Sequence, residues 1–534
     1  MTRPETRNQK PETKAVFWFL VSAFWFLPAL AGGQITAKHA ALSTAHPLAT
    51  KAGLAVLQRG GTAADAAVAV AFALSVVHPQ AGNLGGGGFL LYYDASTRGV
   101  WTLDFRETAP HDATRAMFAK VPAKGALAAG VPGTVAGLNA LHAKFGKRSW
   151  KELLAPAIAL AREGERTDAE LTLDIEAAKK ERGLDIPKAL PPPELAATLQ
   201  RIADHGSKDF YDGELAKRIV ESVRGAGGIL GFRDLREYEP VWRAPIKLHY
   251  GAYEIVTVPP PSGGGLVIGE ALNILSGDDL AARGFQTPKA IHLLVEAERR
   301  AYIDRNRYVA DPVTTRIPYR DLLSQKRAEA WRKTIDPARA VATSMLAEPS
   351  ELRPEGEHTT HFTIADGAGN IVAFTTTLGD DFGSGVLLPG LGFFLNTAMT
   401  DFTATGTNQV DPLKRAASSL SPVMVLRNGK PFLAFGTSGG GSIPTTLLQV
   451  FLNLVVYGKT LAQAIAAPRW HHQAIPDQIE YEHGAPQATI DALNGMGHGV
   501  VERKSIGDVH AILFENGRLT AVADPRHAGA AGGM

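Results

Sequence analysis

Residues 358–377 carry the pattern of a threonine-rich β-hairpin. Two β-rich runs flank a five-residue loop that contains two glycines, and such a loop is typical of a hairpin turn. If Ala365 pairs with Ile371, the register places Thr359 directly opposite Thr377. Directly opposed side chains share one face of the sheet, with Cβ atoms roughly 4.5–5.5 Å apart. A bulge within the hairpin would shift the register by one residue and separate the two threonines.

Two facing threonines have a chemical interpretation as well as a structural one. A threonine hydroxyl is a poor nucleophile unless a base takes its proton. If the backbone is cut immediately before Thr359, the freed α-amine becomes that base, with an ordinary pKa of about 7.7–8.0. Thr377 would then orient the nucleophile. Threonine is also a common strand residue, so these residues alone leave both interpretations open.

A second candidate nucleophile is Ser438, at the centre of a G-x-S-x-G pattern over residues 436–440. An apolar strand precedes the pattern and a plausible helix follows it, as a nucleophile elbow requires. Candidate triad partners follow in the acid-then-histidine order: Asp477, then His483, His498 or His510. The same glycines could instead present backbone N–H groups to an oxyanion. The pattern alone leaves both roles open.

Composition excludes several classes of function. The 534-residue chain has no cysteine, so it has no thiol nucleophile, thiolate metal site or disulfide. Its net charge of +2 provides no general attraction for nucleic acid. An apolar fraction of 45% and a charged fraction of 20% are typical of a globular protein.

Neither cofactor nor metal is expected. The glycine runs at 84–89 and 259–265 lack the Gly-Lys-Ser/Thr of a phosphate loop, and close backbone packing is their expected use. His471 and His472 have no third ligand at a recognisable spacing.

The first 31 residues have the three parts of a secretory signal peptide. Basic residues precede an apolar stretch that ends in the Ala-Leu-Ala of residues 29–31. The stretch is shorter than the roughly 20 residues of a spanning helix, and Pro28 interrupts it. We expect cleavage after Ala31 and a periplasmic or secreted chain, with a short membrane anchor as the alternative. No later segment has the pattern of a membrane span.

The rest of the chain alternates helical and β-like regions. Residues 62–77 are apolar nearly all round, which predicts a buried helix, and Thr62 and Asp65 have the spacing of a capping box. A strand is predicted at 89–93 and an exposed loop at 343–358. Further helical regions are predicted at 135–240, 286–335, 440–465 and 488–496, and β structure from Thr359 onward. This order predicts layered α and β structure.

The ordered motifs resemble those of the γ-glutamyltranspeptidase (glutathione hydrolase) family, a group of N-terminal-nucleophile hydrolases. The resemblance extends over nearly all of the chain after residue 31. It rests on seven segments: 84–89, 104–107, 131–137, 259–264, 359–361, 418–422 and 436–440.

The resemblance implies an α+β fold, the four-layer αββα sandwich, and a precursor that cuts itself between His358 and Thr359. The pieces 32–358 and 359–534 would remain together as large and small subunits. It implies cleavage of γ-glutamyl amides such as glutathione through an acyl-enzyme on Thr359. Water, an amino acid or a peptide would accept the acyl group.

Residue by residue, the resemblance also implies a site. Thr377 matches the family's supporting threonine, and Gly439 and Gly440 match its oxyanion-hole glycines. The binders of the donor's α-carboxylate match Arg106, Ser418 and Ser419. A guanidinium fork suits a carboxylate.

The chain departs from the family where the donor's α-amine is held. Gly379 stands where the family has asparagine, and Ala398 stands where it has glutamine or glutamate. Asp401 remains, and Asp380 or Asp381 could compensate. Each hydrogen bond lost to a charged group costs about 1.5–3 kcal/mol. A glutaryl-type (cephalosporin) acylase of the same family is therefore the first alternative. A serine hydrolase using Ser438 and a non-enzymatic exported binding protein are the others.

Overall fold

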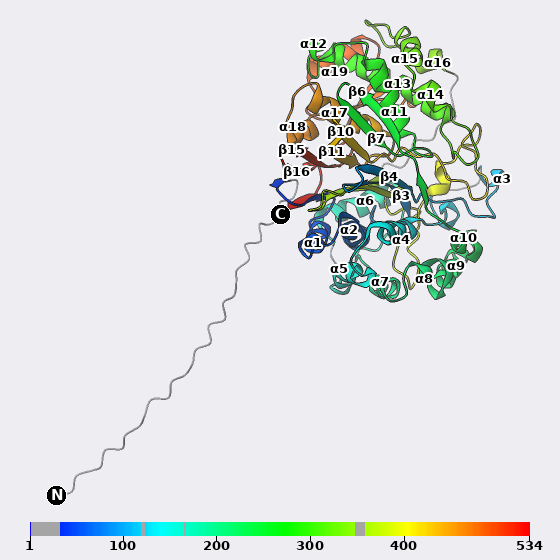
Figure 1. Ribbon diagram of the computed structural model, residues 1–534. Helices are drawn as coiled ribbons and strands as arrows, with labels where there is room; N and C mark the ends of the chain where they lie inside the picture. The colour runs from blue at the N-terminus through cyan, green and yellow to red at the C-terminus, as the bar shows by residue number, and fades with distance from the viewer. Residues whose placement is uncertain (2–32, 119–122, 165–166, 348–357) are drawn as a thin grey trace.

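The computed structural model describes residues 33–118, 123–164, 167–347 and 358–534, together with Met1. Two β-sheets lie face to face at the centre of the molecule, and a layer of helices covers the outer face of each (Figure 1). This is the αββα sandwich that the family resemblance implied.

In the described part of the chain the first sheet has seven strands. Their order is β17 (Ala530–Gly533), β2 (Ala41–Thr44), β8 (His358–Ala365), β9 (Ile371–Gly379), β3 (Gly87–Asp94), β4 (Gly99–Asp104) and β5 (Val241–Arg243).

The second sheet also has seven described strands. Their order is β1 (Gln34–Ala37), β16 (Arg518–Ala523), β15 (Val509–Glu515), β11 (Lys430–Thr437), β10 (Val423–Arg427), β7 (Tyr253–Thr257) and β6 (Ile246–Tyr250). A smaller sheet contains β12 (Trp470–His471), β13 (Ile479–Glu482) and β14 (Val500–Arg503).

The two large sheets meet through their central strands. β8 packs against β11 and β15, and β9 also packs against β11. Both strands, β8 and β9, therefore face the second sheet.

One helical layer covers the first sheet, and α2 is its central member. The helices from this part of the chain are α1 (Pro47–Gln58), α2 (Ala63–Val77), α3 (Arg115–Phe118), α4 (Thr134–Phe145), α5 (Trp150–Arg162), α6 (Ala169–Arg182), α7 (Glu194–His205), α8 (Ser207–Asp212), α9 (Glu214–Gly225) and α10 (Phe232–Arg236). All of α2 is buried between β8 and β9 on one side and α5 on the other.

The sequence of α2 explains its position. Alanine and valine on every side leave no polar face, so the helix is stable only when it is enclosed. The capping box is present: Thr62 Oγ1 accepts from Asp65 N–H, and the Asp65 carboxylate accepts from Thr62 N–H. The predictions for residues 62–77 are confirmed.

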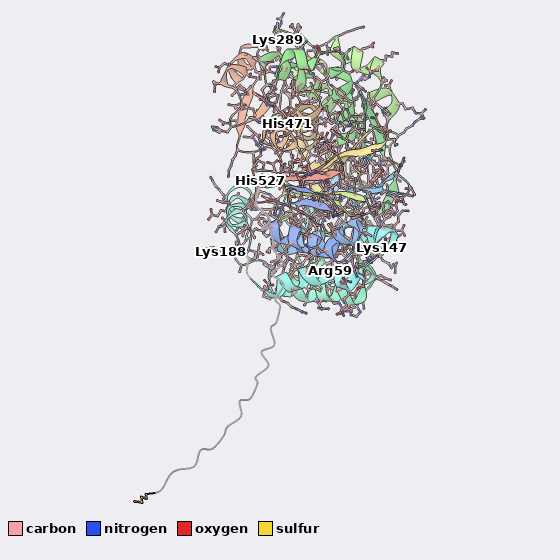
Figure 2. All side chains as sticks on the ribbon, turned by 60° about the vertical axis from the view of Figure 1, so that its left-hand side comes forward. Arg59, Lys147, Lys188, Lys289, His471 and His527 are labelled. Atoms are coloured by element: carbon pink, nitrogen blue, oxygen red, sulfur yellow. The ribbon has the colours of Figure 1, made fainter. Side chains whose placement is uncertain are left out.

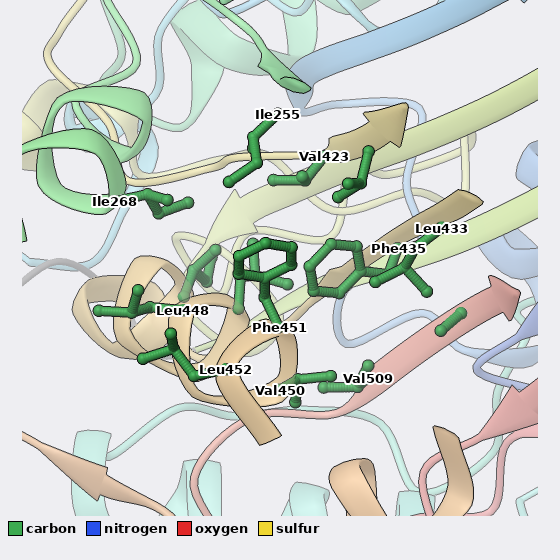
Figure 3. Close-up of a cluster of buried hydrophobic side chains, with 14 of the residues drawn as sticks. Ile255, Ile268, Val423, Leu433, Phe435, Leu448, Val450, Phe451, Leu452 and Val509 are labelled. Carbon is green, nitrogen blue, oxygen red and sulfur yellow. The ribbon is translucent and has the colours of Figure 1, made fainter. Parts of the chain in front are cut away.

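The second helical layer covers the other sheet. Its helices are α11 (Gly264–Leu275), α12 (Leu280–Arg283), α13 (Pro288–Tyr308), α14 (Tyr319–Leu322), α15 (Gln325–Arg332), α16 (Thr343–Leu346), α17 (Ile443–Val455), α18 (Leu461–Ala466) and α19 (Gln487–Gly495). Figure 3 shows Leu448 and Phe451 of α17 packed with Val423 and Phe435 of the sheet. Burial of each such side chain contributes about 1.5–3 kcal/mol.

One loop prediction is wrong in part. Residues 343–346 form the short helix α16 rather than an exposed loop, and Thr343 is buried. The reason is a long-range contact: Asp477 accepts a hydrogen bond from Thr343 N–H at 2.7 Å. His358, the last residue of that predicted loop, begins β8. Residues 348–357 of the loop and residues 2–31 of the predicted signal peptide lie outside the described residues. Among the described residues, no helix is both long and apolar enough to cross a membrane.

Candidate active site

Thr359 and Thr377 are directly opposed in the β8–β9 ladder, as the hairpin register predicted. The register does shift, but only between His358 and Thr359, so the irregularity lies just outside the pair. Both threonines are buried, and the Thr377 hydroxyl accepts a hydrogen bond from Gly379 N–H at 2.8 Å.

Alternation along β8 turns Thr359 toward the second sheet. Thr363, on the same face, donates from its hydroxyl to the His510 carbonyl of β15 at 3.0 Å. His361 lies between them and packs against Gly436 of β11, where a Cβ atom would come within 2.3 Å of its ring. The space between the sheets next to Thr359 is therefore polar and tightly packed.

A glycine turn follows β11, which ends at Thr437. Gly439 and Gly440 have φ angles of +119° and +51°, and a Cβ on Gly439 would lie 2.4 Å from Ser442 Oγ. Glycine is required there both by conformation and by space. This geometry fits backbone N–H donors for an oxyanion.

The nucleophile-elbow interpretation of Ser438 fails on the structure. β11 is antiparallel to both of its neighbours, β10 and β15, whereas an elbow belongs to a parallel α/β sheet. The candidate histidines are also engaged elsewhere: His510 with Ser43 and Asp508, His498 with His292, and His483 with Glu502.

Arg106 belongs to a buried charged cluster that reaches the Thr359–Thr377 pair through its neighbour Glu107. Its guanidinium donates to Glu107 at 3.0 Å and to Asp401. Gly87 makes the connection, because it pairs with Thr377 and a Cβ on it would lie 2.8 Å from the Glu107 carboxylate. Among the described residues, the buried Arg106 Nε and Glu107 Oε1 have no hydrogen-bond partner.

The carboxyl groups around Arg106 have perturbed pKa values. Burial raises the pKa of Glu107 to about 7, with Asp401 and Asp104 adding to the rise and Arg106 opposing it. Burial and the charge of Asp380 also raise the pKa of Asp401, against the effect of Arg106. Clustered perturbed groups of this kind are typical of functional sites.

Ser418 and Ser419 are buried and held by the glycine-rich loop before α11. Gly263 N–H donates to the Ser418 carbonyl at 2.6 Å, and Ser418 N–H donates to the Pro261 carbonyl at 2.9 Å. Ser419 Oγ accepts from Arg305 at 3.3 Å. The prediction of close backbone packing at 259–265 is confirmed, since a Cβ on Gly264 would lie 1.5 Å from Ser421 Oγ. Gly85 and Gly88 also pack closely on backbone carbonyls, where a Cβ would lie 2.1 and 2.2 Å from the oxygen.

The backbone conformation and the packing at Gly379 both favour glycine. Its φ is +95°, and a Cβ there would lie 2.0 Å from Thr397 Oγ1. Ala398 presents only a methyl group. Asp380 lies 3.3 Å from Arg182 of α6, and Asp401 is already bound to Arg106. Asp380 and Asp401 therefore both have guanidinium partners, and Asp381, the third candidate, is buried and accepts from Arg182 through its backbone carbonyl.

Four further residues join the site without having been assigned from sequence: Glu107, Arg182, Tyr302 and Arg305. Glu107 stands in a quoted motif and could have been found there. Tyr302 and Arg305 belong to the charged helical region 286–335, whose charge pattern gave no sign that most of α13 is buried.

The histidine pair predicted not to bind metal has protein partners. His471 hydrogen-bonds Thr445 at 2.8 Å, and His472 lies 3.4 Å from Asp477. A different buried group, His292, Glu296 and His498, has its ligand atoms close together. Arg299 and Arg300 both contact Glu296, and they already balance the charge that would attract a cation.

An αββα sandwich with a threonine near the start of a central strand, a facing threonine and a nearby glycine turn defines an N-terminal-nucleophile hydrolase. Residues 49–534 match the family model described as gamma-glutamyltranspeptidase. The chain belongs to this family of enzymes.

Individual relatives are similar over nearly the full length of the chain. The glutathione hydrolase proenzyme of Escherichia coli (strain K12) is 37% identical over 531 residues, covering 92% of this chain and 91% of the relative. The acylase ACY 1 proenzyme of Pseudomonas sp. (strain SE83) is 34% identical, covering 90% and 91%. The crystal structure of cephalosporin acylase from Bacillus halodurans is similar with a TM-score of 0.85 and 29% identity, covering 94% of this chain and 97% of that one.

Proposed function

We propose that this chain is a self-cleaving amidohydrolase in which Thr359 becomes an N-terminal nucleophile and cleaves γ-glutamyl amides such as glutathione. The observation that carries the proposal is the direct opposition of Thr359 and Thr377. The match to glutathione hydrolase proenzymes supports both the substrate class and the self-processing.

The first step would be cleavage of the precursor. Thr359 Oγ attacks the carbonyl carbon of His358, the bond from that carbon to the Thr359 nitrogen breaks, and the nitrogen takes the hydroxyl proton to become the free α-amine. Water then hydrolyses the resulting ester, which frees the Thr359 hydroxyl and leaves His358 with a terminal carboxylate. The register shift at this peptide bond supports the position of the cut, because irregular ladder positions occur next to active sites. The products would be 32–358 and 359–534, after removal of residues 1–31 during export.

Turnover would then use the new amine. It accepts the proton of Thr359 Oγ as the oxygen attacks the donor's γ-carbonyl carbon. The N–H groups of Gly439 and Gly440 stabilise the oxyanion, and Thr377 orients the nucleophile. The leaving amine takes the proton, and the acyl group on Thr359 passes to water or to an acceptor amine.

The donor's α-carboxylate would be bound by Arg106, Ser418 and Ser419. The support is chemical: Arg106 Nε is a buried donor without a partner among the described residues, and leaving such a group unpaired is costly. A carboxylate oxygen of the donor would satisfy it.

A glutaryl-type acylase is the second candidate, and the amine side of the site favours it. Gly379 and Ala398 offer no polar side chain, and Asp380 and Asp401 already contact arginines. A glutaryl donor keeps the carboxylate and lacks the amine. The acylase relatives support this candidate.

Two measurements test the proposal. Denaturing electrophoresis with sequencing of the small fragment should give Thr359 as its first residue, and Thr359→Ala should leave the chain intact. Ser438→Ala is the control and should still be cut. Hydrolysis of γ-glutamyl and glutaryl anilides then separates the two candidates. A fully active enzyme with an uncut chain would overturn both.

A further inference from the structure

Tyr302 of α13 connects two parts of the site that lie far apart in sequence. Its hydroxyl donates to the Gly441 carbonyl, directly after the oxyanion glycines. The same hydroxyl hydrogen-bonds Ser419, in the proposed carboxylate-binding segment. The side chain is 2% exposed, and its ring meets His471 edge-on at 5.9 Å.

The neighbouring contacts hold this connection in place. Arg305, one helical turn after Tyr302, donates to Ser419 at 3.3 Å. Gly263 lies against the Arg305 stem, where a Cβ would be 2.7 Å from Cγ. On the other side, Gly441 packs against Gln473, where a Cβ would be 2.1 Å from the side-chain amide oxygen. Ser419 and Gly441 are thus both fixed relative to α13.

We propose that Tyr302 is a positioning residue that sets the length of the acyl group the enzyme accepts. The inference rests on the proposed function. A dicarboxylic donor is held at both ends. Ser418 and Ser419 bind its free carboxylate, and Gly439 and Gly440 bind the oxygen of the carbonyl group that reacts. Reaction requires both ends to be in place at once. The separation of these two segments therefore selects the number of methylenes between carboxylate and amide.

Tyrosine suits this role physically. Its ring is rigid and its hydroxyl can donate one hydrogen bond and accept others, so one atom can bind both segments. Burial raises the pKa of the hydroxyl well above its ordinary value, which keeps it a donor. Phenylalanine would fill the same space but would release the Gly441 carbonyl and Ser419 from each other.

The test compares succinyl, glutaryl and adipyl anilides with the processed enzyme and its Tyr302→Phe variant. We expect kcat/KM for the preferred length to fall about tenfold, as for loss of a buried hydrogen bond, while the other lengths fall less. Discrimination between lengths therefore decreases. Arg305→Lys keeps the charge but loses the guanidinium fork, and it should also reduce the discrimination between acyl lengths.

Tyr211→Phe is the matched control. Tyr211 is also buried and donates from its hydroxyl to a backbone carbonyl, that of Pro132, at 3.0 Å, but in the helical layer of the first sheet. This variant should keep the length profile. Equal proportional losses of kcat/KM for all three anilides in Tyr302→Phe, or no loss, would overturn this inference without affecting the proposed function. A processed wild-type enzyme that hydrolyses none of the acyl anilides, γ-glutamyl included, would overturn the proposed function with it.

Discussion

Thr359 faces Thr377 across β8 and β9, while the residue before it, His358, is displaced to pair with Gly379. The register is regular on one side of the proposed scissile bond and irregular on the other. The nucleophile is therefore fixed by the ladder, whereas the peptide to be cut lies where the ladder is disturbed.

Removing the Thr377 hydroxyl should slow catalysis. In Thr377→Val the shape of the strand is kept, but the group that accepts from Gly379 N–H and faces Thr359 is lost. We expect kcat for anilide hydrolysis to fall about a hundredfold, in the range found for single polar groups in active sites. Thr377→Ser should recover most of the rate. A Thr377→Val enzyme with unchanged kcat would exclude a supporting role.

Thr360 is a neighbouring buried threonine whose hydroxyl can be removed without a loss of stability. It lies on the other face of β8, it is buried, and its hydroxyl has no hydrogen-bond partner among the described residues. Thr360→Val removes a desolvated polar group without breaking a bond, so stability should stay equal or rise by about 1 kcal/mol. Thermal unfolding of the processed protein measures this. A lower Tm would show that the hydroxyl is bonded.

Restoring the family's asparagine at Gly379 should fail as a single change. An asparagine at this position would need a φ of +95° and would place its Cβ against Thr397 Oγ1. We expect Gly379→Asn to cost about 2 kcal/mol or more in stability without a gain in γ-glutamyl hydrolysis. Adding Thr397→Ala should recover part of the loss, because it removes the clash and leaves the backbone strain. A stable single variant with higher γ-glutamyl activity would contradict this account.

The local parts of the site could be predicted from sequence. The Thr359–Thr377 register follows from hairpin pairing, the α2 helix from its apolar pattern, and the use of the glycine runs from the missing phosphate-loop residues. In each case the information lies within about twenty residues, where pairing rules and periodicity operate.

The long-range parts could not be predicted. Tyr302 and Arg305 reach Ser419 and Gly441 more than a hundred residues away, and a helix rich in charge is usually exposed. Some of the ion pairs that make its burial tolerable are tertiary contacts, such as Arg327 with Asp304. The close approach of Thr397 to Gly379 is likewise a tertiary contact.

The last prediction concerns His527, which lies at the level of the sheets, between the two helical layers, in Figure 2. It ties the last segment to α6 through Glu170, at 2.8 Å. Burial opposes its charged form, but the hydrogen bond to Glu170 and the charges of Asp508, Glu170 and Asp524 prevail and raise its pKa to about 9. The ordinary value is 6.5, so the folded state binds the proton more tightly. This contribution to stability is complete below pH 6.5 and is lost as the pH rises through 9.

In His527→Gln this part of the pH dependence should disappear, with a loss of stability of about 3 kcal/mol below pH 6.5 and little loss above pH 9. Urea unfolding across that range, compared with the parent protein, measures the difference. His483→Gln is the control: its pair with Glu502 is exposed, and such pairs contribute little. A parallel displacement of the two stability curves at every pH would mean that His527 acts through packing alone, because a neutral contact has no proton to lose.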